Sequence, residues 1–202
     1  MTLTLIIITS IVSILAFQDQ TFFYKSVLSP YRMVHNNEWY RMLTHGFIHG
    51  SYPHLIINMI VLYSFGKAIE YYFGLVTEKV IPHYFVLYFG GMIVSTITTT
   101  IKRRNNPGYM AVGASGAVSA VLFACIFFAP WHKLLLMGVI PIPGIVFAVL
   151  YVLYSSYMSK KGNDNIGHDA HLWGALFGLI YPIVIHPDLF ESFIYQLTHP
   201  TF

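Results

Sequence analysis

Six long apolar segments constrain the fold of this chain more than any other feature of its sequence. They span about residues 3–17, 53–73, 81–101, 110–129, 144–158 and 168–186. A transmembrane helix needs about 20 mostly apolar residues. Only 9% of the 202 residues are charged, whereas a soluble domain carries about 25%, so the chain lacks the polar residues that would cover a water-exposed surface. We therefore predict an all-α, polytopic membrane protein with six transmembrane helices.

The breaks between the segments favour a single domain. The prolines of "VIPIPG" (139–144) exclude a regular helix there, because each one removes a hydrogen-bond donor and restricts its neighbour. We see no internal repeat and no second domain. We expect one membrane domain over residues 1–202, with a core at about 5–185 and a short C-terminal tail at 187–202.

The connection between the first two segments is unusually long. Residues 18–52 contain aromatic and basic side chains but no spanning run. A connection of this length in a small membrane protein is expected to be structured or functional. We predict a loop that is partly embedded in the membrane interface. Ser51 is a candidate N-cap for the following helix, and Pro53 suits its first turn.

Several polar side chains lie near the starts of alternate segments. Ionisable groups inside a membrane are costly, so each one is a functional hypothesis. Ser115 opens the fourth segment and His171 opens the sixth, while His54 and Asn58 share one helical face of the second. With six spans, the starts of the second, fourth and sixth helices lie on the same side of the membrane. These four side chains can therefore meet at a similar depth.

The residues around Ser115 also allow a purely structural interpretation, because small residues let helices pack closely. Four glycines lie at such close-packing positions, namely Gly113, Gly116, Gly174 and Gly178. The same packing would bring the fourth and sixth helices close enough for a Ser115–His171 hydrogen bond, which is the geometry that activates a serine. Asp169 precedes His171 by two residues and so points away from it. We therefore predict a Ser–His dyad suited to acyl transfer.

A zinc site is the alternative interpretation of the histidines. His45 and His49 have the i, i+4 spacing of metalloprotease ligands, and His54, His168 and His171 could contribute. However, the first pair lacks the glutamate that would act as the general base, and no nearby carboxylate completes a site. We expect no metal and no other cofactor.

Three motifs in order resemble those of the rhomboid intramembrane serine proteases. They are "HGFIHGSYPHLIIN" (45–58), "GASG" (113–116) and "AHLWG" (170–174). "EWYR" (38–41) resembles the Trp-Arg element of the family's first loop. The resemblance implies a multi-pass protein that cleaves transmembrane segments of other membrane proteins within the lipid bilayer. The net charge of +3 arises from few charges and does not indicate a nucleic-acid partner.

The resemblance also implies a role for each matching residue. Ser115 would be the nucleophile and His171 the general base and then acid. The Ser115 backbone N–H, His54 and Asn58 would form the oxyanion hole. The expected supporting residues are Gly113, Gly116, Gly174, Gly178, Trp39, Arg41, His45, His49 and the structural acid Glu70. The expected lateral substrate gate consists of Phe147, Tyr151 and Tyr154.

One position departs from the family pattern. Many relatives carry an aromatic residue four positions after the serine, where it stacks on the catalytic imidazole, but this chain has Ser119. The position of His171 must then be set by something else, such as a tyrosine of another helix, or be looser. Since Ser115 and His171 are both present, we expect an enzyme. The alternatives are an inactive rhomboid-like protein that binds client helices and a small transporter with a histidine proton relay.

The basic residues predict an orientation in the membrane that conflicts with the topology of the family. Eight of them lie on the side of the first, third and fifth connections, namely Lys25, Arg32, Arg41, Lys102, Arg103, Arg104, Lys160 and Lys161. The positive-inside rule would put this side in the cytoplasm. The family topology instead puts the N-terminus in the cytoplasm and opens the active site on the extracytoplasmic side of the cell (inner) membrane. We favour the family topology.

Overall fold

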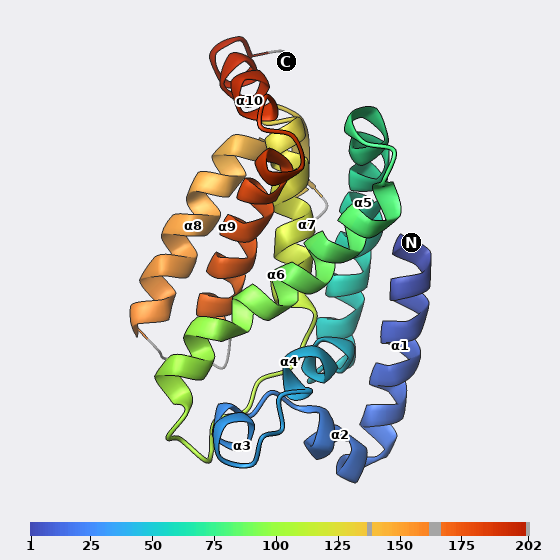
Figure 1. Ribbon diagram of the computed structural model, residues 1–202, viewed down its shortest axis with the longest axis vertical. Helices are drawn as coiled ribbons and strands as arrows, with labels where there is room; N and C mark the ends of the chain where they lie inside the picture. The colour runs from blue at the N-terminus through green and yellow to red at the C-terminus, as the bar shows by residue number, and fades with distance from the viewer. Residues whose placement is uncertain (137–138, 162–166, 201–202) are drawn as a thin grey trace.

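The computed structural model describes residues 1–136, 139–161 and 167–200 and is mostly helical (Figure 1). The helices are α1 (Thr2–Gln18), α2 (Gln20–Ser26), α3 (Pro30–His35), α4 (Arg41–Thr44), the 3-10 helix η1 (His45–Phe47), α5 (Tyr52–Val76), α6 (Val80–Arg103), α7 (Ser115–Phe128), α8 (Gly144–Lys161), α9 (His168–Ile185) and α10 (Leu189–Thr198). Two strands, β1 (Lys133–Leu136) and β2 (Ile140–Pro143), pair in antiparallel register. The six predicted segments correspond to α1, α5, α6, α7, α8 and α9.

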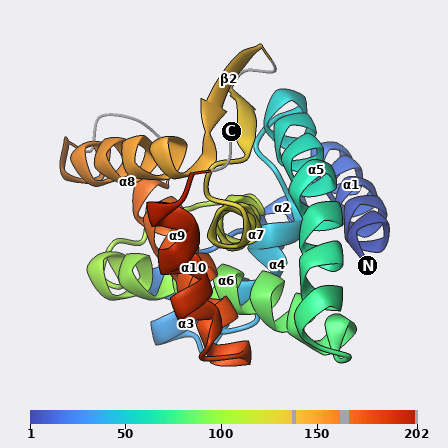
Figure 2. The ribbon, with the colours of Figure 1, turned by 90° about the horizontal axis from the view of Figure 1, so that it is seen from above.

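Helix α7 forms the centre of the bundle. Every residue from Gly116 to Phe127 is buried, because the helix is apolar or small on all its faces. Seen from above, α5, α6, α8 and α9 surround it, and α1 lies outside α5 (Figure 2). Any side chain at the N-terminal end of α7 is therefore held by the helices around it.

Helix α7 begins later than the predicted apolar segment. The sequence predicts an apolar segment at about 110–129, but α7 begins only at Ser115. Ala111 exchanges backbone hydrogen bonds with Leu28, at 2.9 and 3.1 Å, and Gly113 adopts a positive φ of 116°. The backbone of residues 111–113 thus pairs with the first loop and cannot continue a helix.

The connection between α1 and α5 is structured, as predicted, and consists of short helices. Asp19 caps α2 by accepting a hydrogen bond from the Phe22 N–H. Ser29 caps α3 in the same way, with Pro30 in its first turn. These helices gather at the end of the bundle opposite α10 (Figure 1). The predicted N-cap of α5 is confirmed, because the Ser51 hydroxyl accepts from the His54 N–H.

The β-hairpin corrects the prediction of an all-α fold. Strand β1 follows α7 and pairs with β2, so that Leu135 lies opposite Pro141 and Lys133 opposite Pro143. Proline is tolerated in the edge strands of a small sheet, because no neighbouring strand needs the N–H group that proline lacks. The prolines were predicted to prevent a regular helix in residues 139–144. This prediction is confirmed up to Pro143, and α8 begins at Gly144.

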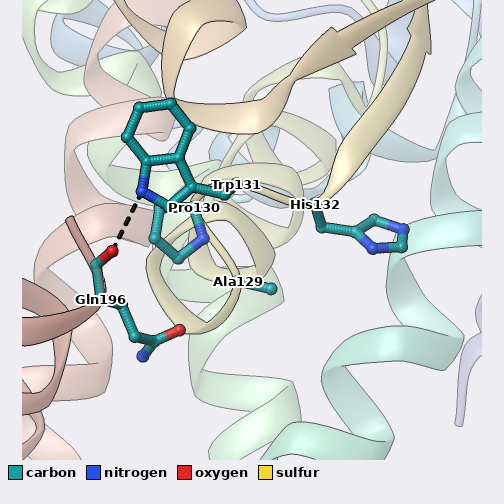
Figure 3. Close-up of a pocket in the computed structure, with 5 residues that line it drawn as sticks. All are labelled: Ala129, Pro130, Trp131, His132 and Gln196. Carbon is teal, nitrogen blue, oxygen red and sulfur yellow. Dashed lines mark hydrogen bonds between the residues drawn. The ribbon is translucent and has the colours of Figure 1, made fainter. Parts of the chain in front are cut away.

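Part of the predicted tail folds as a further helix, α10, which the sequence pattern did not predict. This helix is connected to the end of α7, because the Trp131 indole N–H donates to the Gln196 carbonyl at 3.0 Å (Figure 3). The ring of Phe193 also stacks on that of Phe127, with centroids 4.7 Å apart. A small pocket between Ala129 and Gln196 lies at this contact (Figure 3).

By length and hydropathy, α6 is the one helix of the described segments that could cross a membrane. Helices α1 and α7 are apolar but have only 17 and 14 residues. Helix α5 has 25 residues, but His54, Asn58, Lys67 and Glu70 make it more polar. The mostly helical character is therefore confirmed, and the six spans stay a prediction.

Candidate active site

The N-terminal ends of α7 and α9 bring Ser115 and His171 together. The His171 Nε2 atom lies 2.8 Å from the Ser115 Oγ atom, which is a hydrogen-bond distance. Both side chains are half-buried. Helix α9 holds His171 in its first turn, where its N–H donates to the Gly167 carbonyl at 3.0 Å. The hydrogen bond expected between these two residues is thus present.

Glycines allow this close approach of α9 to α7. A Cβ atom on Gly174 would overlap the backbone of Gly116, and one on Gly178 would overlap the backbone of Ala120. Gly116 in turn lies against Ser95 of α6, where a side chain would also clash. Close packing of small residues therefore sets the separation of the two helices that carry Ser115 and His171.

The turn before Ser115 is anchored on the first loop. The Gly113 N–H donates to the His45 carbonyl at 2.9 Å, and the Ala114 N–H donates to the His49 Nε2 atom at 3.4 Å. The φ of Gly113 lies in the left-handed region, which favours glycine. These two hydrogen bonds and the left-handed Gly113 fix the backbone from which α7 starts at Ser115.

His49 is held as a neutral ring. Its Nε2 atom accepts from Ala114, so its Nδ1–H donates to Ser13 Oγ at 2.9 Å, and that hydroxyl donates to the Phe47 carbonyl. Burial, together with the smaller effect of the neighbouring His54, lowers the pKa of His49 to about 3. Ser13 is not among the predicted site residues, although a polar residue inside the first apolar segment was the available signal.

His45 belongs to the same support. Its Nδ1–H donates to the Arg41 carbonyl at 2.9 Å, and the side chain is buried. Burial lowers the pKa of His45 to about 4. The expectation that His45 and His49 join the hydrogen bonds of the first loop therefore agrees with their positions.

His54 and Asn58 lie beside the turn that precedes Ser115. A Cβ atom on Gly113 would come within 2.7 Å of the His54 ring, so the imidazole rests directly on this glycine. Asn58 is buried, and its amide donates to the His54 carbonyl at 2.9 Å. The two side chains thus lie on the Gly113 side of Ser115, and the Asn58 amide is bound to its own helix.

The start of α7 also supplies backbone donors. The first hydrogen bond within this helix runs from the Val118 N–H to the Ala114 carbonyl at 2.9 Å. The N–H groups of Ser115, Gly116 and Ala117 precede it and so have no carbonyl within the helix to bind. These N–H groups point out of the N-terminal end of α7, where the helix dipole stabilises negative charge.

Arg41 anchors the first loop from inside. Its guanidinium donates to the carbonyls of Tyr24 and Val27 at 3.0 and 2.8 Å and binds Glu38 at 2.6 Å. Burial alone would raise the pKa of the Glu38 carboxyl, but the Arg41 charge lowers it below its usual value. Trp39 was expected to give similar support, but its side chain is 49% exposed.

Glu70 lies away from the candidate site and joins two helices. Its carboxylate accepts from the backbone N–H and the hydroxyl of Thr2, at 2.7 and 2.8 Å, and pairs with Lys67 at 3.2 Å. The Thr2 hydroxyl also bonds to Tyr84 of α6 at 2.9 Å. These contacts agree with the structural role expected of Glu70.

The expected gate residues line the side of α8 near the site. The Phe147 and Tyr151 rings lie 5.6 Å apart, and Tyr154 lies 5.5 Å from the His168 ring. The Asp169 carboxylate pairs with Lys102 of α6 at 2.7 Å and accepts a hydrogen bond from Ser159 of α8. The expectation that Asp169 does not bind His171 therefore agrees with the geometry.

Two other features of the described residues lie apart from this site. The pocket of Figure 3 is at the far end of α7, about 20 Å from Ser115 at 1.5 Å per residue. Within residues 1–136, 139–161 and 167–200, no three His, Cys, Asp or Glu side chains form a metal-binding group.

Comparison with known proteins identifies the family. A rhomboid domain model matches residues 36–188, more than half of the chain. The RHOMBOID-like protein 12, mitochondrial, of Arabidopsis thaliana is 31% identical over 69% of this chain and 44% of its own length. The Presenilin-associated rhomboid-like protein A, mitochondrial, of Danio rerio is 31% identical over 69% and 36%. The Rhomboid protease GluP of Bacillus subtilis is 27% identical over 72% and 26%.

The chain therefore belongs to the rhomboid family, whose members are integral membrane proteins. It spans less than half the length of each of these three relatives. The family includes intramembrane serine proteases as well as other rhomboid-like proteins. Membership therefore makes this chain a rhomboid-type membrane protein.

Proposed function

We propose that this protein is an intramembrane serine endopeptidase that uses a Ser115–His171 dyad to cleave transmembrane segments of other membrane proteins. The observation that carries the proposal is the 2.8 Å contact between the His171 Nε2 and Ser115 Oγ atoms at the start of α7. A protein that only binds client helices has no need of this pair. The sequence match to a family containing proteases adds support.

The reaction follows from the positions of these groups. The Ser115 hydroxyl attacks the scissile carbonyl while its proton passes to His171 Nε2. The resulting oxyanion is stabilised by the Ser115 N–H, with His54 and Asn58 as additional donors. His171 then gives its proton to the leaving amine. Water attacks the acyl-enzyme with His171 again as base, and Ser115 recovers its proton.

The exposed apolar surface supports six membrane spans. Large apolar side chains face outward along five of the helices, and examples are Ile11 of α1, Ile60 of α5, Val86 of α6, Leu153 of α8 and Val184 of α9. Soluble proteins rarely expose so much contiguous apolar surface. We propose a multi-pass protein of the cell (inner) membrane whose active site opens on the extracytoplasmic side.

The substrate must reach a serine inside the bundle. We propose that a substrate helix enters laterally, past Phe147, Tyr151 and Tyr154 of α8, and that water enters from the first-loop side. A regular helix hides its carbonyls in hydrogen bonds, so the substrate has to unwind locally. Helix-weakening Gly or Pro near the cleavage site would therefore favour cleavage.

The test uses purified full-length protein in detergent with a fluorogenic transmembrane substrate. We expect Ser115→Ala and His171→Ala each to lower cleavage at least 10³-fold, since a dyad loses its function with either member. Cleavage should be blocked by a serine-directed phosphonate and be insensitive to chelators. His186→Ala, an exposed histidine of the opposite end, is the matched control, and His168→Ala should retain most activity. Cleavage that survives Ser115→Ala and is lost with a chelator would overturn the proposal.

A further inference from the structure

Ser119, the residue that departs from the family pattern, forms a hydrogen bond with Tyr151. Ser119 lies one helical turn after Ser115 and so on the same face of α7. Its side chain is only 5% exposed, and its Oγ atom lies 2.8 Å from the Tyr151 hydroxyl. A buried hydroxyl needs such a partner. The contact joins α7 to α8 directly beside the nucleophile.

The Tyr151 ring faces the imidazole of His171. The two ring centroids are 6.3 Å apart and the planes differ by 24°, which is an offset stacked arrangement. Phe123 of α7 and Phe147 of α8 flank the tyrosine at 5.3 and 5.6 Å. Its hydroxyl bond and its aromatic neighbours therefore fix the ring in one place.

We propose that Tyr151 is a positioning residue for His171, and that Ser119 acts through it by holding the phenol. The inference rests on the proposed function and deepens it. The imidazole is held at Nε2 by Ser115, and the tyrosine ring restricts its remaining freedom to tilt. The aromatic surface that relatives supply from α7 is thus supplied here from α8, with Ser119 as its tether.

This arrangement connects the gate to the general base. Tyr151 belongs to α8, whereas His171 belongs to α9 and Ser119 to α7. A displacement of α8 that opens the gate also withdraws the ring from His171. The dyad is therefore fully ordered only when α8 lies against α7 and α9, so that substrate entry precedes assembly of the reactive geometry.

The ring is tested with Tyr151→Leu, Tyr151→Phe and the control Tyr157→Leu, an exposed tyrosine of the same helix. Two quantities are measured for the full-length protein: the kcat and KM for a transmembrane substrate, and the rate of inactivation by a small fluorophosphonate, which reports Ser115 reactivity without a gated helix. We expect Tyr151→Leu to lower kcat and the inactivation rate by roughly 3- to 10-fold, the effect of one aromatic pair. The KM should stay within about twofold, and Tyr151→Phe and Tyr157→Leu should retain at least half of both rates.

A residue that served only as a gate would give the opposite result. Removing it would leave the inactivation rate unchanged or increase it, and would alter KM alone. That result with Tyr151→Leu would overturn the inference, as would an equal loss with Tyr151→Phe, which keeps the ring. Loss of wild-type cleavage on Ser115→Ala is checked first, so failure of the proposed function itself is recognised separately.

The hydroxyl contact is tested by a double-mutant cycle that uses only small changes. Ser119→Ala and Tyr151→Phe should each lower the inactivation rate about twofold, and the double variant should be no slower than either single one, because both remove the same hydrogen bond. A double variant that is about fourfold slower would show independent effects and overturn the role of Ser119. This cycle remains decisive if Tyr151→Leu folds poorly.

Discussion

Arg41 illustrates how one buried cation organises a loop of short helices. Its side chain is only 1% exposed, and its donors bind two backbone carbonyls and the Glu38 carboxylate. The carbonyls belong to Tyr24 and Val27, at the end of α2 and just after it. Loss of the guanidinium would leave these two carbonyls and the carboxylate without their hydrogen-bond donor. The loop therefore depends on the planar guanidinium of arginine, which can donate several hydrogen bonds at once.

We therefore expect Arg41→Lys to destabilise the protein by about 2–3 kcal/mol, because a lysine cannot reach all three acceptors and leaves buried groups unsatisfied. Thermal unfolding in detergent would show a lower midpoint than the wild type. Arg32→Lys is the control, since Arg32 is exposed and the change should stay within about 0.5 kcal/mol. Equal midpoints for the two variants would contradict this assignment.

The two buried histidines of the first loop predict acid sensitivity. The pKa of His45 is lowered from 6.5 to about 4 by burial, and that of His49 to about 3. The unfolded state therefore binds more protons than the folded state below about pH 6.5. Stability should be constant above that pH and fall progressively as the pH is lowered toward 4.

The measurement is the unfolding midpoint between pH 7.5 and 4.5. His45→Asn keeps a donor for the Arg41 carbonyl but cannot titrate, so its midpoint should fall less steeply with acid. A slope identical to that of the wild type would exclude His45 as a source of the acid sensitivity. His49 is expected to contribute to the slope that remains.

At the scale of elements, the contact between α7 and α9 sets the positions of Ser115 and His171. Gly178 lies seven residues beyond His171, about 10 Å along the helix. A Cβ atom at this position would overlap the backbone of Ala120, which cannot move without moving α7. The separation of Ser115 and His171 is therefore sensitive to a residue that touches neither of them.

Gly178→Ala is expected to lower cleavage at least tenfold and to destabilise the bundle by about 1–3 kcal/mol, as overpacking does. Gly74→Ala is the matched control, because nothing lies within 4 Å of its would-be Cβ atom on α5. That variant should be unchanged or more stable by up to about 1 kcal/mol. Normal cleavage by Gly178→Ala would show that α9 can shift without disturbing the dyad.

The elements differ in how far their sequences predict them. Helices α5 and α9 could both be predicted from long apolar runs. Ser51 marks the N-cap of α5, and Gly174 and Gly178 mark the packing face of α9. The hairpin and α10 did not follow, since their stability comes from pairing with other segments. Leu134 pairs with Ile142, and Trp131 binds Gln196, and such contacts leave little local signal.

The candidate site shows the same division. Ser115, His171 and the four glycines stand out as polar or small residues at the starts of apolar segments. Tyr151 was expected at the gate, but its stacking on His171 depends on how α8 crosses α7, which spacing within one helix does not determine. Ser13 was missed because its partner His49 is 36 residues away.

At the scale of the whole molecule, charge and family topology disagree about orientation. The first loop and the segment before α7 lie on one side, because Leu28 and Ala111 are paired. Lys102, Arg103 and Arg104 end α6 on that same side. The positive-inside rule assigns it to the cytoplasm. Arg41 and Lys102 are engaged in ion pairs within the protein, which weakens the charge argument.

Labelling of single cysteines decides between the two orientations. The buried Cys125 is first replaced by alanine. Asn106→Cys then marks the exposed connection between α6 and α7, and Glu78→Cys marks the exposed connection between α5 and α6 at the opposite end. With the full chain in the inner membrane of intact bacterial spheroplasts, a membrane-impermeant maleimide should label Asn106→Cys directly and Glu78→Cys only after permeabilisation. The reverse pattern would put the Ser115–His171 end in the cytoplasm and confirm the charge rule instead.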